Sequence, residues 1–217
     1  TEEVSCQLNS KPLDFHFKHI ATQKQGGYYA YRKQYVGESP CFVTERSEFE
    51  TLRDASAKIA DALDTETRTE RFPEAYLGDY SGELDYITYE WQTRRYPVNA
   101  EVQGDVGGDF TVQAGRSDEI NDPAMYSDDR GARKRRAEYV HAAVDGRSVK
   151  SGEEMTIPIP RSDDGVVELL ERLEADRTEV EETDIAELEA EIDDAVYDLF
   201  DLTTEERAVV EDYLDVF

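Results

Sequence analysis

The chain has 217 residues, enough for one large domain or two small ones with a real core, and its 51 acidic and 24 basic residues give a net charge of −27. No apolar run approaches the length of a membrane span, and two isolated cysteines exclude a disulfide framework and a CxxC zinc site. Only seven of the basic residues are lysine and 17 are arginine. Such a surface is typical of molar salt, so we expect a cytoplasmic protein of a halophile, with an acidic tail for a basic partner as the alternative.

The first 64 residues are predicted to form a helix, a strand and a second helix, at residues 8–20, 28–36 and 44–63. Asn9 or Ser10 lies at the cap of the first helix, and Pro12 is tolerated because it falls in the first turn. Gly26-Gly27 predicts a turn before the strand.

Residues 64–82 are polar and read as a linker, after which strand signals dominate. Strands are predicted at residues 84–91, 98–102, 110–114 and 155–159, and a short helix at 137–144. The middle of the chain is therefore interpreted as a small α+β insertion.

Beyond Pro160 the pattern is helical to the end. Ser162 and Thr183 are the predicted caps of helices at 166–173 and 185–200, and Thr203 or Thr204 begins the last helix. Residues 163–217 carry 22 acids and three arginines, which favours packing on protein over contact with phosphates. The fold class is thus predicted as α+β, divided into segments 1–64, 65–160 and 161–217.

A basic island, Leu8 to Tyr35, stands out in this acidic chain. Its cations, opposed by a single acid, are Lys11, Lys18, Lys24, Arg32 and Lys33. We predict that Lys24, Arg32 and Lys33 contact DNA phosphates, because cations gathered in a negative chain fit a polyanion. Gln25 and Tyr29 would then reach base edges or stack. The alternative is that the cations pair with the acidic tail and the tyrosines lie in the core.

A second basic cluster follows Arg130 and consists of Arg133, Lys134, Arg135 and Arg136. We interpret it as a second phosphate site. The alternative is a solvated helix start that balances Asp128 and Asp129.

Other candidate sites are weaker. Trp91 beside Arg94 and Arg95 could form a stacking platform, although a half-buried indole at a strand end is favoured. Asp85 with Glu101 and Gln103 has the residue types of a metal-dependent nuclease, but carboxylates at such spacing arise by chance in so acidic a chain. No catalytic or metal-binding residue is therefore predicted.

Two runs of the sequence contain recognisable motifs. The first contains Leu8-Asn9-Ser10-Lys11, Leu13-Asp14-Phe15, Phe17-Lys18, Gly26-Gly27-Tyr28-Tyr29, Tyr31 and Lys33-Gln34-Tyr35, and the second contains Ile192-Asp193, Val196-Tyr197, Leu199-Phe200, Leu202-Thr203 and Glu205-Glu206. They resemble the runs LNSK…LDFYFK…GGYYRYxKQY and IDxLVYxLYGLTxEE of the C-terminal specificity region of type IIG restriction–modification enzymes and TaqI-like adenine methyltransferases. The family has Gly where this chain has Asp201, so the helix stop is expected to rest on Thr203 or Thr204 instead.

The resemblance implies a target-recognition fragment that positions double-stranded DNA for adenine methylation. S-adenosylmethionine would be bound by a catalytic methyltransferase domain upstream, since this chain has neither a cofactor loop nor an Asn-Pro-Pro-Tyr motif. The chain begins at Thr1 without Met and reads as a piece of a longer protein, not an enzyme by itself. The alternatives are a protein-interaction or scaffolding module that docks on a partner or catalytic subunit, and a truncated, inert recognition region.

Overall fold

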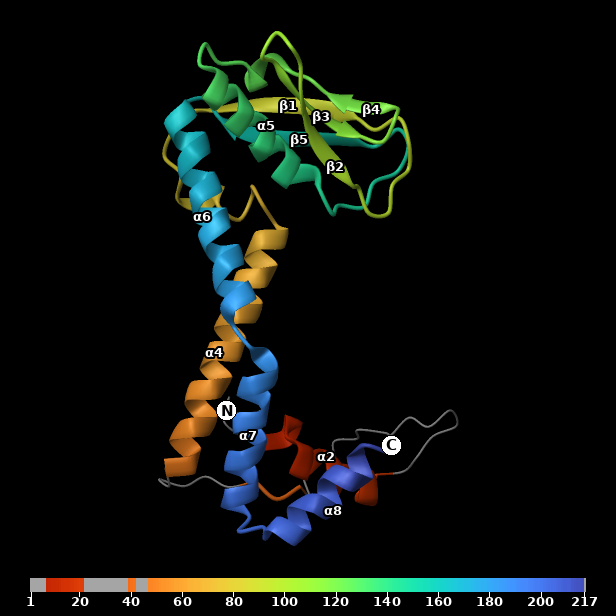
Figure 1. Ribbon diagram of the computed structural model, residues 1–217, viewed down its shortest axis with the longest axis vertical. Helices are drawn as coiled ribbons and strands as arrows, with labels where there is room; N and C mark the ends of the chain where they lie inside the picture. The colour runs from red at the N-terminus through yellow and green to blue at the C-terminus, as the bar shows by residue number, and fades with distance from the viewer. Residues whose placement is uncertain (1–6, 22–38, 42–46, 217) are drawn as a thin grey trace. The chain divides into compact units, whose positions relative to one another are not determined.

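The computed structural model describes residues 7–21, 39–41 and 47–216, which form an α+β fold (Figure 1). The chain divides into two compact units, unit 1 with residues 1–63 and 181–217 and unit 2 with residues 64–180. The first boundary lies near the predicted one, whereas the second falls after residue 180 instead of 160. The two ends of the chain, predicted as separate segments, belong to one unit. The predicted turn at Gly26-Gly27 and the strand at 28–36 lie outside the described residues.

Unit 2 contains two small antiparallel sheets. Strand β1 (Leu84–Glu90) pairs with β5 (Glu154–Pro160) over their whole length. Strands β2 (Ala100–Gly104), β3 (Phe110–Ala114) and β4 (Asp118–Ile120) form a meander. The four predicted strands are confirmed within two residues at each end. Strand β4 was not predicted, because three residues with two acids give no alternating apolar signal.

Helix α5 (Arg130–Val144) packs against strands of both sheets and completes the core of unit 2 (Figure 1). It starts seven residues before the predicted helix, because Asp129 caps it by accepting a hydrogen bond from the Ala132 N–H at 2.9 Å. Its buried side chains meet those of the two sheets in one apolar cluster that includes Ile87, Val112, Ala137, Val140, Ala143, Val144, Ile157 and Ile159. A short 3-10 turn, η2 (Pro123–Met125), leads from β4 towards this helix.

Two longer helices each cross a unit boundary. Helix α4 (Ser47–Glu70) continues seven residues past its predicted end, because no glycine or proline interrupts it before Pro73. The predicted linker is thus helical at first, and a 3-10 turn, η1 (Leu77–Asp79), follows. Helix α6 (Asp163–Glu182) is capped by Ser162, as predicted, whose Oγ accepts the Gly165 N–H at 3.1 Å. Its first half buries Val166, Leu169, Leu170 and Leu173 in the unit 2 core.

Unit 1 is helical in the part that the structure describes. Helices α2 (Lys11–Ile20), α7 (Ile185–Leu199) and α8 (Thr204–Leu214) join the first part of α4. Their shared core consists of Leu13, Leu52, Ala55, Leu188, Ile192, Ala195, Val196 and Leu199. The caps were predicted well at Ser10 and at Thr203, which forms a capping box with Glu206. The cap of α7 is Asp184 and not Thr183 as predicted.

Helix α7 does not end in the way that the sequence predicted, with a stop at Thr203 or Thr204. Asp201 has φ +52°, the left-handed region that favours glycine. The Leu202 N–H donates to the Tyr197 carbonyl at 3.0 Å and the Asp201 N–H to that of Asp198 at 3.1 Å. This is a Schellman motif, and it stops the helix at Asp201 itself, so the stop was not displaced to Thr203 or Thr204.

None of the described helices is both long enough and apolar enough to cross a membrane.

Candidate nucleic-acid interface

The predicted contacts of the basic island, Lys24, Gln25, Tyr29, Arg32 and Lys33, lie outside the described residues. Its two described cations are paired with acids. The Lys11 Nζ lies 3.0 Å from a carboxylate oxygen of Glu211, and the Lys18 Nζ lies 3.1 Å from one of Asp14. The pairing with the acidic tail that was weighed as an alternative therefore holds for Lys11.

Arg136 of the second basic cluster points inward and is only 4% exposed. Its guanidinium donates to a carboxylate oxygen of Asp163 at 2.6 Å and to the carbonyls of Ala124, Pro160 and Arg161 at 2.7–3.2 Å. Burial by itself would raise the pKa of Asp163, but hydrogen bonds from Ser127 and Arg136 outweigh it and lower that pKa.

Helical spacing explains this position. Arg136 lies four and seven residues before Val140 and Ala143, so it shares the buried face of α5 with them. The prediction that Arg136 contacts phosphate is therefore wrong, and this spacing is the sequence signal that would have shown it.

Of the other cations in the cluster, one supports the fold and the rest lie nearer the surface. Arg133 donates to the carbonyls of Gly108 and Ser127 at 2.9 and 2.8 Å, and so fixes the tip of the β2–β3 hairpin. Lys134 and Arg135 are more exposed and form ion pairs with Glu138 at 3.0 and 3.1 Å. Such surface pairs stabilise a fold little, so a phosphate can replace the carboxylate. Arg130 is exposed at the start of the helix.

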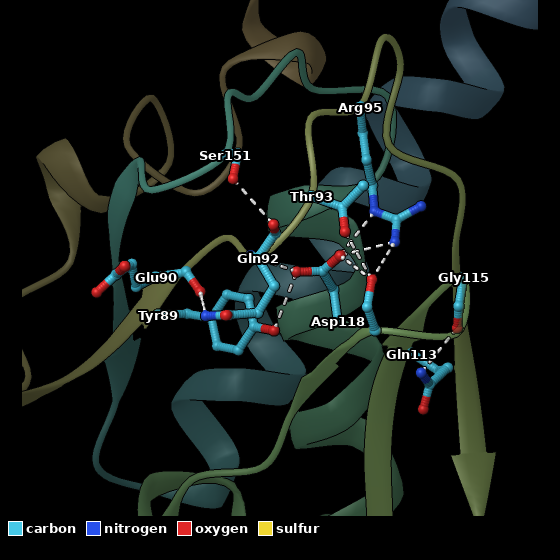
Figure 2. A network of polar contacts seen from close by, with 10 residues as sticks. Tyr89, Glu90, Gln92, Thr93, Arg95, Gln113, Gly115, Asp118 and Ser151 are labelled. Carbon is cyan, nitrogen blue, oxygen red and sulfur yellow. Dashed lines mark hydrogen bonds and ion pairs between the residues drawn. The ribbon is translucent and has the colours of Figure 1, made fainter.

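A buried carboxylate organises another edge of unit 2 (Figure 2). Asp118 on β4 is 0% exposed and accepts hydrogen bonds from Arg95 at 2.7 and 3.2 Å and from the Gln92 N–H at 2.7 Å. The hydroxyls of Ser117 and Tyr89 donate to it at 3.1 and 3.3 Å. Burial alone would raise the pKa of Asp118, but the hydrogen bonds from Arg95, Gln92 and Ser117 outweigh it, so the pKa lies below its usual value.

Further hydrogen bonds tie three loops together around this carboxylate (Figure 2). The hydroxyls of Thr93 and Ser117 lie 2.7 Å apart, and the Ser151 hydroxyl donates to the Gln92 carbonyl at 2.9 Å. We call the surface formed by residues 91–96, 115–118 and 148–153 the loop edge. Trp91 begins it but is 0% exposed, so the stacking-platform hypothesis for this residue is wrong and its indole is fully buried at the strand end.

An isolated antiparallel bridge sets the direction of the side chains on the loop edge. Arg95 and Val149 exchange both backbone hydrogen bonds, each with an N···O distance of 3.0 Å. The Arg95 side chain runs to Asp118 and Val149 is 3% exposed. The residues on either side of the bridge, Arg94 and Tyr96 on one segment and Ser148 and Lys150 on the other, are exposed.

Those neighbours form a basic and aromatic surface. The register of the bridge places Arg94 opposite Lys150 and Tyr96 opposite Ser148. They line a surface hollow of about 660 Å³ together with Val149 and Glu153. Within the part of the chain that the structure describes, neither Arg94 nor Lys150 takes part in an ion pair. The sequence pointed to Arg94 but missed Tyr96 and Lys150, because their pairing depends on contact between distant segments.

The residues weighed for metal-dependent cleavage are not brought together as a site. The Asp85 carboxylate on β1 accepts from Arg161 at 3.1 Å, while Glu101 and Gln103 lie on β2, in the other sheet. The described residues hold no group of three or more His, Cys, Asp or Glu side chains arranged to bind a metal ion.

Comparisons of the chain with protein-family models, with curated proteins and with solved structures found no match.

Proposed function

We propose that this chain is the DNA target-recognition part of a restriction–modification methyltransferase of the type IIG class. The resemblance of its two end runs supports this function, and one structural observation carries it. Arg94 and Lys150 are exposed, line the same surface hollow, and form no ion pair with a described residue. Two cations held near each other repel. In a chain with 51 acids, such a pair fits an anionic ligand that bridges it.

The proposal gives each group of cations a role. Arg94 and Lys150 bind phosphates, and the exposed Arg130 and Lys134 and the half-buried Arg135 on α5 supply further phosphate contacts in the same unit. Lys24, Arg32 and Lys33 of the island add affinity, while Gln25 and Tyr29 read or stack on bases. Arg133 and Arg136 support the fold. Methylation itself is carried out by a catalytic domain that binds S-adenosylmethionine. This chain positions the DNA for that domain, in the cytoplasm.

Charge reversal tests the proposal. The variant Arg94→Glu/Lys150→Glu is expected to raise the Kd for a duplex at least tenfold, and to reduce the slope of log K against log salt by about two, because two phosphate contacts are lost. Arg32→Glu/Lys33→Glu is expected to abolish duplex binding while the fold stays intact. Both are measured by fluorescence anisotropy over a KCl series in which circular dichroism shows the chain folded.

The matched control is Arg71→Glu/Arg177→Glu, which reverses two exposed arginines of the same unit and changes the net charge equally. It should weaken binding far less. An equal loss in control and test variants would mean that only net charge matters, and would remove the loop edge from the interface.

A second candidate is a protein-interaction module. It is favoured by the acidity of the C-terminal helices, since residues 181–217 hold 15 acids and one arginine. The salt dependence separates the two functions: phosphate binding weakens linearly in log salt, whereas protein packing in an acidic chain holds or strengthens as salt rises. Absence of duplex binding at every salt concentration would favour the interaction module.

A further inference from the structure

We propose that Tyr96 forms, with Arg94 and Lys150, a subsite for an unpaired nucleotide, in which the tyrosine ring stacks on the base and the two cations bind the phosphates on either side. This inference rests on the proposed function and names the form of DNA that the loop edge prefers.

The exposure of Tyr96 is the first observation. Tyr96 is 81% exposed, more than Tyr86 at 62% and Tyr126 at 59%, the other exposed tyrosines among the described residues. The ring of Tyr126 is covered by the Arg133 guanidinium at 5.5 Å, and its hydroxyl donates to Asp128. Tyr96 has no ring contact, cation contact or hydroxyl hydrogen bond to any described residue. Both sides of a large ring are thus presented to solvent.

The geometry of the bridge is the second observation. Arg95 and Val149 form an isolated hydrogen-bonded bridge, and Arg94 and Lys150 lie immediately beside it, one on each of the two bridged segments. Tyr96 follows Arg95 in the chain, so it too lies beside the bridge. Arg94, Tyr96 and Lys150 thus line one surface hollow of about 660 Å³ that is open to solvent.

The backbone beneath this face is anchored by buried contacts, which favours a binding site over an incidental surface. Val149 is buried, and Arg95 is fixed to the fully buried Asp118, so the backbone that carries Tyr96 is anchored on its inner side. The acid that lines the hollow, Glu153, accepts the backbone N–H of Lys150 at 2.9 Å and is not in an ion pair with its ammonium group. The two cations are therefore available to phosphates.

Stacking decides which nucleic acid fits. In an intact duplex both faces of a base are covered by its neighbours, so a side chain can stack on it only after extrusion or in a single strand. A site with a solvent-exposed ring beside two phosphate-binding cations therefore prefers an unpaired nucleotide to a paired one.

The experiment compares three fluorescent probes by anisotropy: a fully paired duplex, the same duplex with one bulged nucleotide, and a single strand of the same length. The intact chain is expected to bind the bulged duplex about tenfold more tightly than the paired one, the range that stacking on one aromatic side chain gives. Tyr96→Ala should abolish this preference while its affinity for the paired duplex changes less than twofold. Tyr96→Phe should retain the preference, because the ring remains.

Tyr86→Ala is the matched control, an exposed tyrosine of the same unit on β1. It should leave all three affinities unchanged. Duplex binding with no preference for the bulge, or a preference that survives Tyr96→Ala, would overturn the subsite and leave the proposed function standing. Failure of the intact chain to bind any of the three probes would overturn both.

Discussion

At the scale of single residues, Asp118 is the side chain on which the loop edge depends most. We expect Asp118→Asn to lower the free energy of unfolding by about 3 kcal/mol, because it leaves Arg95 partly buried opposite a neutral amide. The pKa of Asp118 is lowered in the folded state, so its stabilising contribution is present above the unfolded pKa and is lost as the pH falls through the folded one. The free energy of unfolding of Asp118→Asn should therefore change less between pH 7 and pH 3 than that of the unmodified chain.

Urea denaturation at the two pH values measures this effect. Glu119→Gln is the control, since Glu119 is the next residue on β4 and is exposed. Equal stability of Asp118→Asn and the unmodified chain at pH 7 would show that the buried carboxylate does not anchor the loops.

Three arginines show what single residues reveal in the sequence and what they do not. Arg136 could have been predicted as buried, because it follows the helical period of Val140 and Ala143. Arg95 and Arg94 are adjacent in the sequence, yet one holds a buried acid and the other faces solvent. Which of them points inward depends on the pairing of Arg95 with Val149, a long-range contact with no local signal. Local chemistry thus offered a platform of Trp91, Arg94 and Arg95 only as the less favoured reading, and it gave no signal that Tyr96 would be the exposed ring.

At the scale of elements, Asp201 gives the clearest test. A non-glycine residue in the left-handed region is strained, and a carboxylate at a helix C-terminus opposes the helix dipole. Asp201→Gly should therefore raise the free energy of unfolding by about 1 kcal/mol. Asp201→Asn should give a smaller gain, because it removes the charge and tolerates this backbone. Thermal and urea unfolding measure both, and destabilisation by Asp201→Gly would show that the carboxylate is itself a stabilising contact.

Most helices and strands could be predicted from the sequence, and the wrong predictions show on which signals this depended. Strand β3 was predicted at its observed bounds because alternation and flanking glycines agree. Helix α4 was predicted too short because its last seven residues are polar, and apolar periodicity ends before the helix does. Strand β4 is too short for a period, and its buried Asp118 argues against a strand until Arg95 is known to pair with it.

At the scale of the whole molecule, the net charge of −27 should act in opposite directions on folding and on DNA binding. The Debye length falls from about 10 Å at 0.1 M salt to about 3 Å at 1 M, so salt screens the repulsion among the 51 acids and also screens phosphate from the cations. A single KCl series therefore tests both properties in the same protein.

Between 0.1 and 2 M KCl we expect the free energy of unfolding to rise by about 2 kcal/mol, which corresponds to a gain of roughly 4–8 °C in Tm, while duplex affinity falls. Two double variants, Arg94→Glu/Lys150→Glu and Arg71→Glu/Arg177→Glu, each make the net charge four units more negative. Both should therefore need more salt to reach the same Tm. Only Arg94→Glu/Lys150→Glu should lose duplex affinity at a fixed salt concentration. Scanning calorimetry and anisotropy measure the two responses. A Tm that is constant or falls with KCl would contradict adaptation to molar salt, and it would leave the excess of acids to be explained by a basic partner.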